Sequence, residues 1–217
     1  AFLQRLLTGD LGRSFVFNMP VLDLVLSRLP ATLEIALLAV LGATLIGVPA
    51  GMLAGWKPHH PLSRLVMGVS VLGFSVPTFW IGLLLILVFA VWLGWLPAGG
   101  RGPTAPWFGV EWSVATLEGW KHLLLPALNL ALFKMALMMR LARAGTREVL
   151  LGDTVRMARA TGQSEQTILT RHVLRLIAIP IVTVFGLELG ATLAFAVVTE
   201  TIFSWPGAGK LIIDSIQ

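Results

Sequence analysis

The stretch that decides the fold is LVMGVSVLGFSVPTFWIGLLLILVFAVWLGWL, residues 65–96, which contains no charged residue. A straight helix needs only about 20 apolar residues to cross the hydrocarbon core of a bilayer. This stretch is longer, and we expect its helix to break at Ser75-Val76-Pro77-Thr78, because proline removes a backbone donor and clashes with the preceding turn. The run therefore predicts a membrane protein with a helix break at Pro77.

The composition of the whole chain supports this prediction. Of its 217 residues, 56% are hydrophobic and 12% are charged, and the mean hydropathy is +0.85. Soluble domains carry roughly 25% charged residues, so an ordinary core could not bury this much apolar surface. The net charge of +5 could suggest nucleic acid, but the basic residues lie in loops between apolar runs, so we expect no nucleic-acid partner. The absence of cysteine excludes disulfides and Cys-based metal sites.

Four apolar segments are long enough to span a membrane. They cover residues 30–56, 65–96, 122–139 and 176–199, and the last two contain Lys134 and Glu188 respectively. The predicted fold class is an all-α polytopic helical bundle. The chain begins with Ala1 rather than Met, and we expect it to be a fragment with further spans beyond its ends.

The charges in the connecting segments predict the orientation. Residues 56–64 and 140–175 are rich in Lys and Arg, whereas residues 94–121 balance their charges and are rich in Gly, Pro and Trp. Loops rich in Lys and Arg lie on the cytoplasmic side, so residues 94–121 are expected to face outward. The segment from Asp10 to Leu29 is then also outside, and its mixture of charged and apolar residues suggests an interfacial helix.

Two sets of glycines are spaced for close helix packing. They are Gly47, Gly51 and Gly55 in the first apolar segment, and Gly186 and Gly190 in the fourth. Small residues four apart allow helix backbones to approach each other in a membrane bundle. Glycine is also common in membrane helices in general, so this spacing alone identifies no function.

A charged island interrupts the apolar pattern at RMARATGQSE, residues 156–165, and continues to Pro180. Residues 140–148 are expected to extend the third span beyond the membrane surface. Gly152 and Asp153 then interrupt the helix, and Asp153 is expected to cap a short helix that ends at Gly162. Ser164 is expected to start the helix that re-enters the membrane.

This island has more features than a loop that only needs positive charge. Ala158 and Ala160 are small enough to let a partner surface approach closely. Arg159 and Glu165 can make directional, charge-assisted contacts. We therefore interpret the island as a docking element in preference to a solvated basic loop.

Three segments resemble permease subunits of binding-protein-dependent ABC importers of the dipeptide/oligopeptide/nickel group. They are Met157–Ser164 with Arg171-His172-Val173-Leu174-Arg175 and Ile179-Pro180; Ser75-Val76-Pro77-Thr78-Phe79-Trp80; and Val198–Gly207. The Ser-Trp-Pro-Gly ending is more similar to the first, B-type, of the two paired permeases. Met157, Thr161 and Gln163 depart from the family's usual Thr, Lys and Leu, and Arg156 replaces the Glu of the general importer motif.

The resemblance implies a type I importer transmembrane domain, with four spans in this chain and six in the whole protein. Residues 1–29 would be a periplasmic or interfacial segment after a missing first span, residues 30–217 the transmembrane domain, and about 153–175 the coupling segment. The implied partners are a second permease in a heterodimer, two ATPase subunits, a periplasmic or lipid-anchored binding protein, and lipid. The implied location is a bacterial or archaeal inner membrane. Dipeptides, oligopeptides, nickel and glutathione all remain open as the solute.

The resemblance also assigns roles to residues. The expected ATPase-coupling residues are Arg156, Ala158, Arg159, Ala160, Gly162, Ser164 and Glu165. Pro77 would break a helix in the pathway. Glu200, Trp205, Pro206 and Gly207 would serve an outer gate or docking site. Glu188 is a candidate pathway residue.

Other function classes have less support. Residues 206–211 resemble a phosphate loop in outline, but Ser204 and Leu211 stand where Gly and Ser or Thr are required. We therefore expect no catalytic residue and no cofactor in this chain, with ATP and Mg²⁺ bound by partner subunits. The histidines show no zinc-ligand spacing, so no metal is expected. The alternative that stays open is an ion-coupled transporter or channel that uses Glu188 and Lys134, although Lys134 could also extend to the membrane surface.

Overall fold

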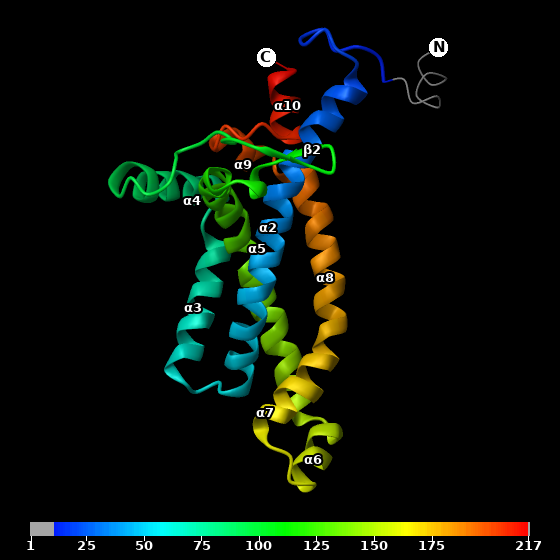
Figure 1. Ribbon diagram of the computed structural model, residues 1–217. Helices are drawn as coiled ribbons and strands as arrows, with labels where there is room; N and C mark the ends of the chain where they lie inside the picture. The colour runs from blue at the N-terminus through cyan, green and yellow to red at the C-terminus, as the bar shows by residue number, and fades with distance from the viewer. Residues whose placement is uncertain (1–10, 217) are drawn as a thin grey trace. The chain divides into compact units, whose positions relative to one another are not determined.

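The computed structural model describes residues 11–216, and within them leaves the side chains of residues 69 and 72–75 undescribed. The described chain is mostly helical (Figure 1). Its elements, in chain order, are α2 (Val21–Trp56), α3 (Pro61–Ser75), α4 (Thr78–Leu85), η1 (Ile86–Trp92), β1 (Ala105–Trp107), β2 (Val110–Trp112), η2 (Ser113–Ala115), α5 (Leu117–Leu151), α6 (Asp153–Ala160), α7 (Glu165–Thr167), η3 (Ile168–Val173), α8 (Leu174–Phe195), α9 (Val197–Ile202) and α10 (Ala208–Asp214).

The chain divides into two compact units. Unit one comprises Ala1–Leu37, Thr78–Asn129 and Thr192–Gln217, and unit two comprises Leu38–Pro77 and Leu130–Ala191. Each unit is described by itself below.

Within residues 11–216, three helical segments are long and apolar enough to cross a membrane. They are Val21–Trp56, Leu117–Leu151 and Glu165–Phe195. The apolar stretch 65–96 forms the helices α3 and α4 on either side of the predicted break, and the apolar helix Thr78–Trp92 taken alone is shorter than a span.

The helix break at Pro77 is confirmed. Val76 has an extended backbone with φ −100° and ψ 129°, and it ends α3. A residue before proline is displaced from the helical region by the proline ring, so the helix cannot continue through Val76. Whether this break lies in a transport pathway stays a prediction.

The other predicted spans are close to the observed helices, with different beginnings. α2 begins at Val21, so residues 21–29 are its first turns and not a separate interfacial helix; Asp10 lies outside the described residues. α5 begins at Leu117, where the Thr116 hydroxyl accepts a hydrogen bond from the Gly119 amide at 2.9 Å. α5 continues to Leu151, which confirms the predicted extension of the third span through residues 140–148.

The first set of glycines makes the predicted close contacts, in unit two. A Cβ added at Gly51 would meet the carbonyl oxygen of Met139, and one added at Gly55 would lie 2.8 Å from that of Arg143. α2 and α5 therefore pack backbone to backbone. The same prediction for Gly186 and Gly190 is not confirmed, because a Cβ at either position would meet no described atom within 4 Å.

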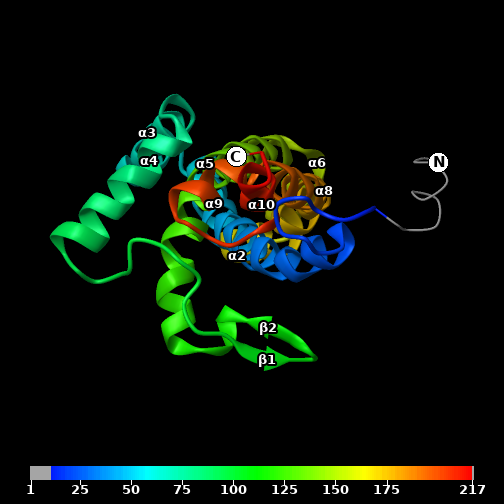
Figure 2. The same ribbon diagram turned by 90° about the horizontal axis from the view of Figure 1, so that it is seen from above.

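Unit one contains a two-stranded antiparallel hairpin. Trp107 of β1 pairs with Val110 of β2, and the two residues between them, Phe108 and Gly109, have φ angles of 53° and 77°. Positive φ at both central positions is the geometry of a type I′ hairpin turn. Figure 2 shows the hairpin projecting to one side, away from α9 and α10 of the same unit.

Candidate functional site

The charged island lies in unit two, where α5 ends and α8 begins (Figure 1). The chain turns at Gly152, whose backbone is extended with φ −75° and ψ 159°, and α6 follows from Asp153. The prediction that Asp153 caps this helix is wrong in detail: Gly152 is the N-cap, and Asp153 is the first helical residue. Its carboxylate lies 3.5 Å from the Arg156 guanidinium, and both side chains are exposed.

One face of α6 packs inside unit two. Val155 and Ala158, three residues apart, belong to a buried apolar cluster that also contains Ile168, Val173 and Ile177. Spacing of three places two side chains on one face of a helix, which explains why these two are buried together. This corrects the prediction for Ala158, whose small side chain allows α6 to approach its own chain and does not lie on the exposed surface.

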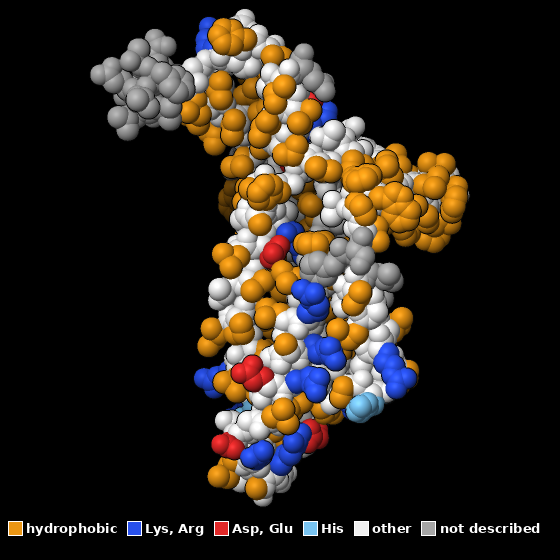
Figure 3. All heavy atoms as spheres, turned by 180° about the vertical axis from the view of Figure 1, so that it is seen from behind, with side chains coloured by type: hydrophobic (Ala, Val, Ile, Leu, Met, Phe, Trp, Pro, Cys, Tyr) orange, Lys and Arg blue, Asp and Glu red, His pale blue; other side chains and the backbone are white. Residues whose placement is uncertain are grey.

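The opposite face of α6 is exposed. It carries the side chains of Arg156, Met157 and Ala160. Met157 is 67% exposed, although it is an apolar residue on a charged helix. Figure 3 shows Lys and Arg side chains gathered toward the end of unit two that holds α6. The island thus presents a basic surface with an apolar side chain in it.

Gly162 ends α6 as predicted, through a specific pair of backbone hydrogen bonds. Its amide donates to the carbonyl of Arg159 at 3.0 Å, and the Gln163 amide donates to the carbonyl of Ala158 at 3.1 Å. These two bonds, with a residue of positive φ between them, are the Schellman ending of a helix. Gly162 has φ +80°, a conformation that costs glycine little and other residues more. A glycine is therefore required at this turn.

Two polar contacts within the island fix the next helix. The Ser164 hydroxyl accepts a hydrogen bond from the Thr167 amide at 3.3 Å and so caps α7, as predicted. The Arg159 guanidinium donates to both carboxylate oxygens of Glu165, at 2.8 and 3.3 Å. The predicted directional contacts of Arg159 and Glu165 are thus made with each other, across the turn.

The Arg159–Glu165 pair shifts both pKa values. The hydrogen bond from Arg159 lowers the pKa of Glu165, with a smaller contribution from Trp56, and the same bond raises the pKa of Arg159. Hydrogen bonding to a charged form favours that form. Since both side chains are more than 40% exposed, water screens much of this interaction.

The start of the returning helix has a feature that the sequence did not predict. Residues Ile168–Val173 form a π-helical turn before α8. His172 lies on this turn, and its Nε2 is 2.8 Å from the side-chain oxygen of Gln163, which connects the turn to the loop after α6. π-helical turns are rare and are found frequently at functional sites.

Lys134 and Glu188, which the sequence places inside the third and fourth predicted spans, contact each other in unit two. The Lys134 ammonium donates to a Glu188 carboxylate oxygen at 2.5 Å, and the two side chains are only 9% and 20% exposed. The prediction that Lys134 could extend to the membrane surface is therefore wrong. Pairing explains how both charges are tolerated between apolar helices.

The residues predicted for an outer gate form a buried network in unit one. The Glu200 side chain is fully buried and accepts hydrogen bonds from the Thr32 hydroxyl at 2.6 Å and the Lys210 amide at 2.7 Å. Trp205 is also fully buried, and its indole donates to the carbonyl of Ala31 at 2.8 Å. The side chains of Glu200 and Trp205 connect this segment to α2, and their role in an outer gate or docking site stays a prediction.

The glycine-rich stretch at residues 207–210 surrounds the chain's own carboxylate. A Cβ at Gly207 would collide with the carboxylate of Glu200, and one at Gly209 would lie 2.9 Å from it. The glycines at 207 and 209 let the backbone approach the Glu200 carboxylate, as the glycines of a phosphate loop let the backbone approach a phosphate. This shared need explains the likeness of the two sequences. Pro206 is only partly buried, and with Arg28, Lys210 and Asp214 it borders a small polar hollow of about 130 Å³.

A second buried network in unit one was missed by the sequence reasoning. The Arg101 guanidinium donates to Glu34 at 3.0 Å, to the carbonyl of Glu111 at 2.7 Å and to the Ser113 hydroxyl at 3.1 Å. The Ser113 amide also donates to the Glu34 carboxylate. The sequence did contain one signal for this network. Glu34 is a lone carboxylate at the start of an apolar span, and a buried carboxylate needs a partner.

The sequence also matches a known protein family. Residues 47–217 match the family described as "Binding-protein-dependent transport system inner membrane component". The chain belongs to this family. It is therefore an all-α, polytopic inner-membrane component of a transport system that depends on a binding protein, and the matched region contains the whole charged island.

Three similar proteins cover the entire chain. A di/tripeptide transport system permease protein of Pseudomonas aeruginosa (strain UCBPP-PA14) is 41% identical, and a dipeptide transport system permease protein of Alkalihalophilus pseudofirmus is 37% identical; this chain spans 68% of each. A glutathione transport system permease protein of Escherichia coli (strain K12) is 38% identical, and this chain spans 65% of it.

Among residues 11–216, no group of three or more His, Asp or Glu side chains lies close enough together to hold a metal ion. The histidines predicted to lack zinc-ligand spacing show other contacts: His60 accepts a hydrogen bond from the Leu62 amide at 3.2 Å, and His122 lies 3.0 Å from the carbonyl of Gly99.

Proposed function

We propose that this chain is the permease subunit that forms half of the path for ATP-driven uptake of di- or tripeptides or related small solutes. The similar proteins named for peptide and glutathione transport, each aligned over the whole chain, support this solute class. The B-type ending Ser204-Trp205-Pro206-Gly207 supports pairing with a second, different permease. A periplasmic or lipid-anchored binding protein delivers the solute.

The observation that carries the proposal is the construction of the island. A short helix is fixed to its own unit by Val155 and Ala158, is ended by Gly162, and leaves Arg156, Met157 and Ala160 uncovered. This arrangement is suited to insertion into a groove of a partner. The partner that we propose is an ATPase subunit, which binds the ATP and Mg²⁺, so that this chain hydrolyses nothing itself.

Each coupling residue then has a distinct role. Arg156 and Ala160 face the ATPase, together with Met157. Arg159 and Glu165 hold the two arms of the turn together, and Ser164 starts the following helix. Force from the ATPase reaches α5 and α8 through the buried side chains of α6, because a packed apolar cluster transmits displacement as a unit.

The remaining predicted roles are proposed in narrower form. Pro77 breaks the helix within the pathway, and Glu188 contributes to the lining of the path only as the partner of Lys134. The segment from Glu200 to Gly207 stabilises the outer end of the transport path through its buried side chains. α8 supports the contact with the second permease, because Ile179, Val182 and Leu187 are exposed and Gly186 and Gly190 leave room for a neighbour. The alternative of an ion-coupled transporter is not retained, because the family is a binding-protein-dependent one.

The test is uptake of a labelled dipeptide into proteoliposomes that contain the full-length permease and its partner subunits. We expect uptake to require ATP on the side of the membrane that holds the ATPase subunits. We also expect it to require the binding protein on the opposite side. Uptake that proceeds with an ion gradient alone would contradict the proposal.

The coupling role is tested separately with two matched variants in the island. Ala160→Trp adds bulk to the exposed face of α6 and should abolish ATP-driven uptake and retention of the ATPase subunits during purification. Gln166→Trp introduces the same side chain at an exposed position of α7, outside the proposed contact, and should leave both unchanged. Equal behaviour of the two variants would contradict the assignment of this face.

A further inference from the structure

The hairpin of unit one has two chemically different faces. In an antiparallel pair, directly opposed residues share a face, so Trp107 and Val110 lie on one face with Ala105 and Trp112. Glu111, the single ionisable residue in the sequence from 105 to 112, lies on the other face, where its carboxylate accepts a hydrogen bond from the Thr104 hydroxyl at 2.6 Å. The hairpin is thus amphipathic, with aromatic rings on its apolar face.

The tip of the hairpin displays a bulky apolar residue in an unfavourable backbone conformation. Phe108 has φ 53° and is 92% exposed, and its ring centroid lies 5.5 Å from that of Trp107. Asn or Gly is the usual residue at this position of a type I′ turn, and a bulky residue at positive φ is a genuine outlier. Strain of this kind persists where the side chain has a use outside the local fold.

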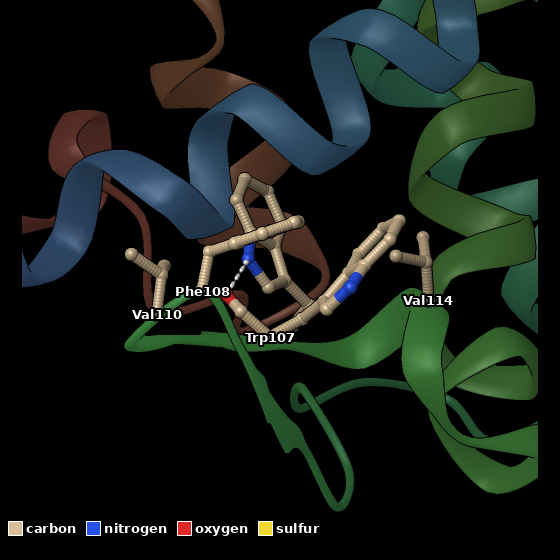
Figure 4. Close-up of a pocket in the computed structure, with 5 residues that line it drawn as sticks. Trp107, Phe108, Val110 and Val114 are labelled. Carbon is tan, nitrogen blue, oxygen red and sulfur yellow. Dashed lines mark hydrogen bonds between the residues drawn. The ribbon is translucent and has the colours of Figure 1, made fainter.

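An apolar hollow accompanies the tip. Trp107, Phe108, Val110, Trp112 and Val114 line a space of about 280 Å³ (Figure 4). One indole of the lining has its partner within the hairpin: the Trp112 indole donates to the carbonyl of Trp107 at 3.2 Å. The surface left over is hydrocarbon and aromatic ring.

We propose that the Trp107–Phe108 tip inserts into the lipid interface on the outer side of the membrane. The hairpin is joined to α5 by only residues 113–116, so it is held next to the point where a membrane-length helix begins. Trp and other aromatic side chains with an apolar body are enriched at this depth of the bilayer. The proposal does not depend on the coupling role of the island.

The charges around the hairpin favour lipid over a protein partner. Arg101, Glu111, Glu118 and Lys121 are the ionisable residues from 101 to 121, and each has a partner within the chain. A binding protein that docks and leaves in every cycle would use a polar rim with available charges for orientation. A lipid interface requires the apolar face alone.

These 217 residues contain no cysteine, so a single cysteine introduced here is unique within them. Any cysteine elsewhere in the importer is replaced by serine before labelling with an environment-sensitive fluorophore. The labelled variants are Phe108→Cys and, on the opposite face, the matched control Glu111→Cys. Each is reconstituted in the complete importer in nanodiscs that contain nitroxide-labelled phosphatidylcholine, and quenching by that lipid is compared with quenching by iodide in water.

We expect the lipid nitroxide to quench the label at position 108 several-fold more strongly than the label at 111, and iodide to show the reverse order. Equal quenching of both labels by iodide would overturn the proposal. Protection of position 108 that appears only after addition of the binding protein would also overturn it, in favour of a docking site.

A second pair of variants separates insertion from folding of the turn. Phe108→Asn gives the turn its preferred residue and removes the apolar tip, so the hairpin should remain folded. With the fluorophore at Trp107→Cys, we expect the additional Phe108→Asn change to lower quenching by the lipid nitroxide several-fold. Unchanged lipid quenching would contradict a role for the Phe108 ring.

Discussion

Two Arg–Glu pairs in this protein have similar geometry and opposite surroundings. In unit one, Arg101 and Glu34 are 3.0 Å apart, with side chains 15% and 1% exposed. In unit two, Arg159 and Glu165 are 2.8 Å apart, with side chains 45% and 43% exposed. The buried pair holds a loop to α2 and cannot lose one partner cheaply, whereas water can replace either partner of the exposed pair.

This difference assigns the two regions different tasks. Unit one holds the carboxylates of Glu34 in α2 and Glu200 in α9 inside the fold, where they serve structure. The island of unit two keeps its charges at the surface, and its fixed shape comes from backbone hydrogen bonds and from buried apolar side chains. A docking element needs such a surface, because its contacts must form and separate during each transport cycle.

The largest expected loss of stability follows from breaking the buried pair. Glu34→Gln leaves the Arg101 guanidinium without its counter-charge, and removal of one partner of a buried pair costs about 3–5 kcal/mol. Thermal unfolding of the purified permease in detergent, followed by tryptophan fluorescence, measures this loss. The double variant Glu34→Gln with Arg101→Gln removes both charges and keeps an acceptor for the Ser113 amide, so it should recover part of the loss; a double variant less stable than the single one would show that the unpaired charge is not the cause.

A smaller loss is expected in the loop that surrounds Glu200. Gly207→Ala places a methyl group against the Glu200 carboxylate, and overpacking of this kind costs about 1–3 kcal/mol. Gly186→Ala is the matched control, because a Cβ there meets no described atom within 4 Å. The same unfolding assay should place the control within experimental scatter of the wild type. Similar losses for both alanines would count against the close packing of this loop.

A still smaller effect is expected for the exposed pair. Glu165→Gln removes the charge opposite Arg159, and exposed ion pairs contribute roughly 0.2–1 kcal/mol. We expect a slight fall in unfolding temperature that shrinks further in high salt, since salt screens surface charges. A loss as large as that of Glu34→Gln would remove the distinction between the two regions.

The smallest predicted effect is the dependence of stability on the protonation of Glu165. Because Arg159 lowers the pKa of this carboxyl, the pair contributes stability above the ordinary glutamate pKa of about 4.3, and the contribution disappears as pH falls through the lowered value. Carbon-detected NMR of labelled glutamate should show the lowered pKa. Arg159→Met should return it toward the ordinary value; no difference between the two proteins would contradict the assigned cause.

Local features of the island could be predicted from the sequence, and distant contacts could not. Gly152, Gly162 and Ser164 act on their immediate neighbours, so their turn and capping roles are readable from spacing. Lys134 and Glu188 are 54 residues apart, and Glu34 and Arg101 are 67 apart. The sequence shows that such charges need partners but does not say which partner the fold brings to each.

The error at Ala158 has a clear physical origin. Ala158 was predicted to face a partner because small residues permit close approach, but the approach is made by its own chain. The residue type predicted the close approach and did not identify which surface makes it.

The central claim is that α6 and the turn at Gly162 form the element that receives the ATPase. Gly162→Val tests it most directly, because a β-branched residue cannot adopt φ +80° without strain, with Gly68→Val in an open position of α3 as the control. The measurement is ATP-driven dipeptide uptake by the reconstituted importer, alongside quantification of the permease in the membrane. We predict that Gly162→Val abolishes uptake at unchanged membrane abundance while the control transports normally; wild-type uptake by Gly162→Val would contradict the account.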